Sequence, residues 1–153
     1  MTLSEPNQQF LQEIVDRNIL PISELSNIPP TISNMHGILG EIAPSMDTAA
    51  YLAYALQQET AFLRIPGLQI DFEFLKTIPK DTLSKLVSED IMVIPLRKTA
   101  NTLWLGVGRP YPCPIQEIQQ LLQTNNLGWN VLLPQEFVEQ CRQIEQKTGI
   151  TCS

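Results

Sequence analysis

Few residue types in this chain could perform chemistry, and their spacing predicts neither a metal site nor a nucleophile. His36 is the only histidine, and no Cys or Asp lies at metal-ligand spacing from it. Cys113 stands in a Pro-Tyr-Pro-Cys-Pro run, where Arg109 is the only neighbouring positive charge that could lower its pKa. Cys141 falls on the apolar stripe of a predicted helix, so we expect it in the core.

The glycine-rich segment and the acidic residues also lack a pattern typical of phosphate binding or catalysis. Gly106 and Gly108 are followed by Pro110 and Pro112 instead of a helix N-terminus. They therefore predict the close packing of a helix or of the Trp104 ring. Four acidic residues show no pairing typical of a catalytic cleft and are interpreted as a solvated face: Asp71, Glu73, Glu89 and Asp90.

The composition indicates a chain that can fold but offers little to nucleic acids or membranes. It has 153 residues, of which 43% are hydrophobic and 17% charged, with a formal net charge of −6. Because nucleic-acid binding needs clustered Lys and Arg, we expect no nucleic-acid partner. No apolar run approaches the roughly 18 residues of a membrane span, and the N-terminus lacks the features of a signal peptide. Three widely spaced cysteines favour a reducing cytoplasm over a disulfide framework.

Residues 1–64 predict a small helical module. Residues 1–9 are polar and expected to fray, and helical spacing of apolar residues begins directly after them. Asn18 suits the left-handed end of that first helix. The strongest helix of the module is rich in Ala and Leu and follows either Asp47 or Thr48 as its N-cap.

Residues 65–150 predict an α/β module built around a hairpin. Residues 91–96 are apolar on both faces, and residues 103–107 alternate with period two. Residues 99–101 supply the turn. The other predicted elements are helices over 80–87, from Pro114 and from Pro134, and a strand over 129–133. The expected order is helix, strand, strand, helix, strand, helix, which is an α+β fold with a three-stranded sheet.

Two tryptophans lie on the predicted strands, Trp104 on the second and Trp129 on the third. Tryptophans at such positions more often belong to the core than to a ligand platform. If both point outward from the sheet, however, they form a partner-binding patch.

Five short motifs occur in order along this second half. They are Ile-Asp-Phe at 70–72, Leu-x-x-Ile-Pro at 75–79, Ile-Pro-Leu at 94–96, Thr-Leu-x-Leu-x-Val at 102–107, and Arg-Pro at 109–110. Together they resemble the N-terminal domain of the assembly ATPases of type II secretion and type IV pili, the general secretion pathway protein E family and the Msh pilus ATPase. The resemblance covers about residues 37 to 140, and the family has Asp-Pro where this chain has Arg-Pro.

The helical half is similar to the family's paired cyclic di-GMP-binding motifs, although both copies depart from the pattern. The copy over residues 10–25 has Gln9 and Leu11 where the family places Arg and Gly. The missing arginine matters because Arg supplies both stacking and charge-assisted bonds to a dinucleotide. In the second copy, over residues 39–59, the resemblance implies these ligand-binding residues: Leu39, Gly40, Leu52, Leu56 and Gln58.

The resemblance implies a non-enzymatic interaction or regulatory module. The chain contains no G-x-x-x-x-G-K-[ST] motif, so ATP hydrolysis is not implied, and we expect no cofactor. The expected partner is a protein of a secretion or pilus system, because the family's N-terminal domains dock onto membrane-platform proteins. The alternative is a cyclic di-GMP sensor. An enzymatic function would need convergent polar groups in a pocket, which the sequence does not predict.

Overall fold

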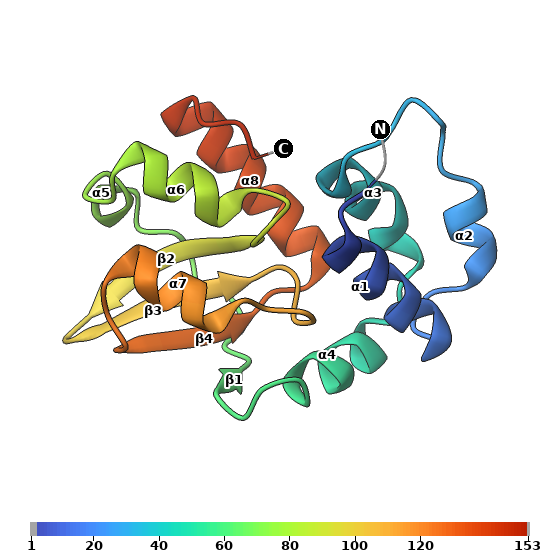
Figure 1. Ribbon diagram of the computed structural model, residues 1–153, viewed down its shortest axis with the longest axis horizontal. Coiled ribbons are helices and arrows are strands. Elements are labelled where there is room, and N and C mark those ends of the chain that lie inside the picture. The colour runs from blue at the N-terminus through green and yellow to red at the C-terminus, as the bar shows by residue number, and fades with distance from the viewer. Residues whose placement is uncertain (1–2, 153) are drawn as a thin grey trace.

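The computed structural model describes residues 3–152 and contains a four-stranded mixed sheet with the order β1-β4-β3-β2 (Figure 1). The strands are β1 (Phe62–Leu63), β2 (Val93–Thr99), β3 (Thr102–Val107) and β4 (Leu127–Val131). β2 and β3 are antiparallel, whereas β4 is parallel to both β3 and β1. The predicted α+β class is confirmed. The prediction of three strands missed β1, because two residues are too few to show the alternation of a strand.

The β2–β3 hairpin forms where the period-two pattern predicts it. Its turn places Ala100 in the left-handed region, with a φ of 51°. Pro95 has no N–H to donate, and the register shifts between Pro95 and Arg97, which marks a β-bulge. Residues 91–96 are all buried, as predicted for a strand covered on both faces.

Helix α7 (Ile115–Leu122) is the crossover that the parallel pairing of β3 and β4 requires. It passes in front of the strands in Figure 1. Helix α8 (Pro134–Thr148) follows β4 and begins at the predicted proline. It ends at Gly149, whose φ of 75° suits a left-handed cap. Its fully buried stripe includes Phe137 and Ile144.

Two helices precede the hairpin, α5 (Phe72–Leu75) and α6 (Lys80–Val87). The Asp71 carboxylate caps α5 by accepting hydrogen bonds from two N–H groups of its first turn, at 3.1 and 3.3 Å. The Asp71 N–H donates to the Leu96 carbonyl at 2.7 Å, which fixes this segment against the edge of β2. α6 packs on β2. The order predicted for this half therefore agrees with α6, β2, β3, α7, β4 and α8.

The N-terminal part is helical, as predicted. Its elements are α1 (Glu5–Asp16), α2 (Ile22–Ser26), α3 (Met35–Ile42), the 3-10 helix η1 (Ala43–Ser45) and α4 (Thr48–Leu56). The predicted fraying is wrong from Glu5 onward, while residues 1 and 2 lie outside the described residues. Asn18 has the predicted left-handed conformation, with a φ of 59°. Asp47 caps α4 by accepting a hydrogen bond from the Ala50 N–H at 3.0 Å.

The helical and sheet parts share one hydrophobic core, although the sequence predicts separate segments over 1–64 and 65–150. Buried residues from Phe10 in α1 to Ile144 in α8 belong to a single cluster. α3 packs on α8, and α4 packs on β1 and β4. The predicted boundary falls directly after β1, so a strand of the first segment pairs with a strand of the second.

Candidate functional site

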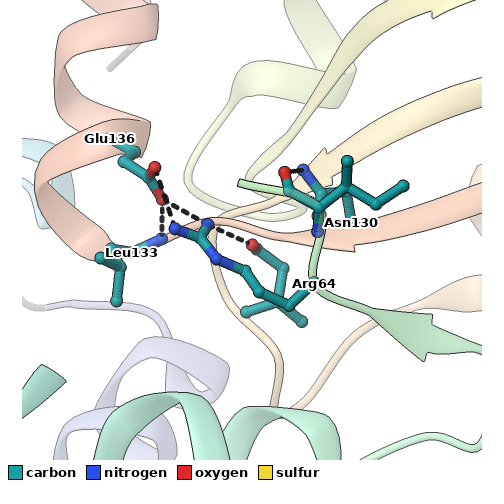
Figure 2. A network of polar contacts seen from close by, with 6 residues as sticks. Arg64, Asn130, Leu133 and Glu136 are labelled. Atoms are coloured by element: carbon teal, nitrogen blue, oxygen red, sulfur yellow. Dashed lines mark hydrogen bonds and ion pairs between the residues drawn. The ribbon is translucent and has the colours of Figure 1, made fainter. Parts of the chain in front are cut away.

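A polar cavity of about 190 Å³ lies at the carboxyl ends of the parallel strands β1 and β4. Three of its lining residues are labelled in Figure 2: Arg64 follows β1, Asn130 belongs to β4, and Glu136 lies in the first turn of α8. The figure also labels Leu133, the residue before α8, whose N–H bonds Glu136. Ligands of open α/β sheets bind outside the carboxyl ends of parallel strands. This cavity is therefore the candidate ligand site that the topology of the sheet indicates.

The charge of Arg64 is neutralised inside the cavity wall. Its guanidinium meets the Glu136 carboxylate in a bidentate pair, with N–O distances of 2.6 and 3.2 Å, and donates to the Val131 carbonyl at 3.0 Å. Glu136 also accepts a hydrogen bond from the Leu133 N–H at 2.7 Å. The Arg64 and Glu136 side chains are 17% and 30% exposed. The pair joins β1 to the N-terminus of α8.

Asn130 extends the pairing of β1 and β4 with its side chain. Its Oδ1 accepts from the Ile65 N–H at 2.6 Å, and its Nδ2 donates to the Ile65 carbonyl at 3.2 Å. Both ends of the amide thus imitate a strand neighbour, and the side chain is buried. Because both ends of the Asn130 amide are bonded to Ile65, few of its hydrogen-bonding groups remain for a ligand.

The cavity wall offers little for catalysis. None of its lining residues is a histidine, cysteine, serine or lysine. Its two carboxylates, Glu136 and Glu139, are both ion-paired with arginines. The hydrogen bond from Arg142 holds the pKa of Glu139 below its ordinary value. The arrangement can hold a small polar group or water, and nothing in it activates a nucleophile.

A second arginine, Arg109, is buried without a carboxylate partner among residues 3–152 and is only 1% exposed. It donates to the carbonyls of Pro112 at 3.0 Å, Glu89 at 2.8 Å and Asp90 at 2.7 Å, and to the Asn7 Oδ1 at 2.7 Å. Burial lowers the pKa of Arg109, while Cys113 and Asp90 oppose that shift. Arg109 thereby connects α1 with two loops at the end of the sheet.

The chain matches no protein-family model, no curated protein and no solved structure.

The two tryptophans do not form one patch. Trp104 is the register partner of Gly128, and Leu105 is the partner of Trp129, so the tryptophans lie on opposite faces of the sheet. Trp129 is only 4% exposed and packs against Phe62 with ring centroids 6.2 Å apart. The predicted two-tryptophan binding patch is therefore wrong, because the register directs one ring into the core.

The glycines do serve close packing, as predicted. A Cβ on Gly108 would lie 2.3 Å from the Phe137 ring of α8. The Trp104 ring packs on Gly128, where a Cβ would lie 2.4 Å from it, and not on Gly106 or Gly108. The Trp104 indole N–H donates to the Thr99 hydroxyl at 2.9 Å. This tryptophan thus covers β4 from the half-buried face of the hairpin.

The five residues expected to bind a dinucleotide do not converge. Leu39 is fully buried in the core, whereas Leu56 is exposed at the end of α4. Gly40 lines a groove against α8. Leu52 is half-buried, and the Gln58 amide donates to the Tyr54 carbonyl at 3.0 Å.

Sequence reasoning missed a cation in this helical half. The Arg17 guanidinium lies 5.0 Å from the centroid of the Tyr54 ring and pairs with Glu13 at 2.7 Å. Gln58 bonds the backbone of the same tyrosine. Arg17 is the only arginine in the first 63 residues, and this isolation was the sequence feature that could have identified it.

His36 and the cysteines occupy packed positions. The His36 Nε2 lies 3.1 Å from the Val87 carbonyl, and its ring stacks on Phe137 at 5.3 Å. Burial lowers the pKa of His36 and raises that of Cys113 to about 12. Cys141 lies in the core, as predicted. Within residues 3–152, no group of three or more His, Cys, Asp or Glu side chains could hold a metal ion.

The acidic residues do not form one solvated face. Asp71 caps α5, and the half-buried Glu89 accepts a hydrogen bond from the Met35 N–H at the start of α3. For these two residues the prediction is wrong, because each carboxylate satisfies the free N–H groups of a helix N-terminus. Glu73 and Asp90 are exposed, as predicted.

Proposed function

We propose that the protein is a non-enzymatic docking or regulatory module of the kind found at the N-terminus of type II secretion and type IV pilus ATPases. One observation carries this proposal. Three of the five motifs behind the resemblance, those at 70–72, 94–96 and 102–107, meet on the β2–β3 hairpin. The Asp71 N–H bonds the Leu96 carbonyl, and Ile94 pairs with Gly106. If this chain shares a scaffold with those N-terminal domains, the matching motifs should pack together in one structural unit.

The polar groups of this scaffold support docking better than chemistry. Arg64 is paired with Glu136, and Arg109 bonds carbonyl and amide oxygens. Neither guanidinium is free to polarise a substrate. Burial raises the pKa of Cys113 to about 12, which leaves almost no thiolate for nucleophilic attack at neutral pH.

We place this function in the cytoplasm, where the partner would be a component of a secretion or pilus system. All three cysteines are free thiols, which suits a reducing compartment. Within residues 3–152, no helix is both long enough and apolar enough to cross a membrane.

The test is to identify the partner. The tagged full chain is expressed in its source organism and treated with a chemical crosslinker, and the captured proteins are identified by mass spectrometry. We expect enrichment of a secretion or pilus protein over a tagged control protein of similar charge. Capture of only unrelated proteins in repeated experiments would contradict the proposal.

The cyclic di-GMP alternative has one supporting contact. Arg17, which lies over the Tyr54 ring beside Gln58, provides an exposed cation for the phosphates of a dinucleotide, whereas Tyr54 itself is only 3% exposed. Calorimetry with cyclic di-GMP decides between the functions, with Arg17→Gln as the matched variant. A binding isotherm that is lost in Arg17→Gln would favour the sensor. Absence of heat at high micromolar ligand would leave the docking function as the better explanation.

A further inference from the structure

The basic side chains of this acidic protein are distributed unevenly. The net charge is −6, yet three of the five lysines line a single groove. These are Lys76, Lys80 and Lys147, and all three are exposed. Because the surrounding protein is negative, such a concentration of positive charge is a local feature that an acidic partner can recognise.

The groove lies between the α5–α6 segment and the C-terminal end of α8, which are neighbours at the upper left of Figure 1. Its volume is about 210 Å³. The floor is apolar and includes Leu75, which is buried, and Ile78 and Ile150, which are half-buried. Leu75 and Ile78 belong to the Leu-x-x-Ile-Pro motif, so the floor is built from one of the motifs behind the resemblance.

The lysines of this groove are available, whereas the arginines of the protein are engaged. Within residues 3–152, Lys80 and Lys147 have no ion pair or hydrogen bond through their ammonium groups; Lys147 lies 5.1 Å from the centroid of the Phe72 ring. Lys76 pairs with Glu73 at 3.2 Å, but an exposed pair of this kind is weak and exchanges easily. All five arginines have intramolecular partners: Arg17, Arg64, Arg97, Arg109 and Arg142.

We propose that this lysine-rimmed groove docks an acidic segment of a partner protein. The segment would place an apolar side chain on the floor and carboxylates against the three ammonium groups. Charge complementarity selects the partner and accelerates its association, and the apolar contact adds affinity at the centre. This inference rests on the proposed docking function and specifies the chemistry of the partner.

The probe is a displayed library of random peptides, selected on the full-length chain. We expect the enriched peptides to combine one or two apolar residues with flanking Asp or Glu. The best peptide is then synthesised with a fluorophore, and its affinity is measured by fluorescence polarisation at low and high salt. Binding should weaken as salt rises, because the charges are exposed. Enriched peptides without an acidic bias would overturn the proposal.

The decisive variant reverses the three charges, Lys76→Glu, Lys80→Glu and Lys147→Glu together. We expect it to weaken peptide binding by about tenfold or more, with an unchanged circular dichroism spectrum. A second variant with Gln at the same positions guards against misfolding by charge reversal. Lys98→Glu is the matched control, because Lys98 is an exposed lysine outside the groove. Equal weakening of peptide binding in the control, or no weakening in either triple variant, would contradict the groove as the docking site.

Two further measurements distinguish an acidic protein partner from an anionic membrane, and the groove from the docking function as a whole. Vesicles of phosphatidylcholine and phosphatidylglycerol test an anionic membrane, and lysine-dependent binding to them without peptide binding would overturn the protein partner. The triple variant is also used in the crosslinking experiment. If it still captures a secretion or pilus protein, the docking function holds and the groove is wrong as its site. If wild-type protein captures none, the docking function itself is contradicted.

Discussion

Arg64 and Arg109 both connect segments that are distant in sequence, but they do so with different kinds of partner. Arg64 is half-buried and faces the Glu136 carboxylate. Arg109 is fully buried and faces three carbonyl oxygens and one amide oxygen. In the first case the charge is cancelled by an opposite charge, and in the second every hydrogen-bond acceptor is a neutral oxygen.

The difference shows which groups depend on each arginine. Without Arg64, Glu136 can still accept the Leu133 N–H and can reach water, because it is 30% exposed. Without Arg109, the Pro112 and Asp90 carbonyls lose their donor in a place that water reaches poorly, while the Glu89 carbonyl keeps the Asn7 amide at 3.2 Å. The polar connection of α1 to the end of the sheet passes through Arg109 and through a direct hydrogen bond from the Asn7 amide to the Glu89 carbonyl, whereas β1 is joined to α8 by the Arg64–Glu136 ion pair.

The strongest test of this comparison is Arg109→Leu. We expect the free energy of unfolding to fall by about 3–5 kcal/mol, because several buried acceptors lose their donor at once. Urea unfolding followed by circular dichroism measures the change. Arg109→Lys is the control: it keeps the charge but cannot form the planar fork, so its loss should be intermediate. A loss below about 1 kcal/mol in Arg109→Leu would mean that water satisfies the carbonyls.

Arg64→Leu should have a smaller effect, of about 1–2 kcal/mol, because Glu136 remains solvated. Glu136→Gln is its counterpart and retains an acceptor for the Leu133 N–H. Combining both changes in a double-mutant cycle gives the coupling energy of the pair, and we expect the two losses not to add. The comparison fails if Arg64→Leu costs as much as Arg109→Leu.

The local features of the fold could be predicted from sequence. The hairpin follows from period-two alternation, and the end of α1 follows from the tolerance of Asn18 for a left-handed conformation. The start of α4 follows from the capping capacity of Asp47. In each case the cause and the effect lie within a few residues of each other.

The contacts that define the candidate site could not be predicted in the same way. Arg109 bonds a residue 102 positions away, and Arg64 bonds one 72 positions away. The opposite orientation of Trp104 and Trp129 depends on the register between β3 and β4, which no local pattern fixes. No local pattern around Arg109 predicts its burial, because two of its partners, Asn7 and Glu89, come from other segments of the chain.

The mildest test concerns His36, which joins α3 to the sheet part through Val87 and Phe137. Burial lowers its pKa below 6.5, although Glu89 and Glu145 face it and act in the opposite direction. The unfolded chain therefore binds the proton more readily than the folded one. As the pH falls below 6.5, the free energy of unfolding should decrease, and it should level off below the folded pKa.

His36→Gln keeps a donor for the Val87 carbonyl but does not titrate, so urea unfolding over a pH series should show a weaker decrease in this variant. Because Glu89 and Glu145 are common to both proteins, the difference between the two curves isolates His36. Identical curves would show that the ring is protonated as easily in the folded protein as in the unfolded chain.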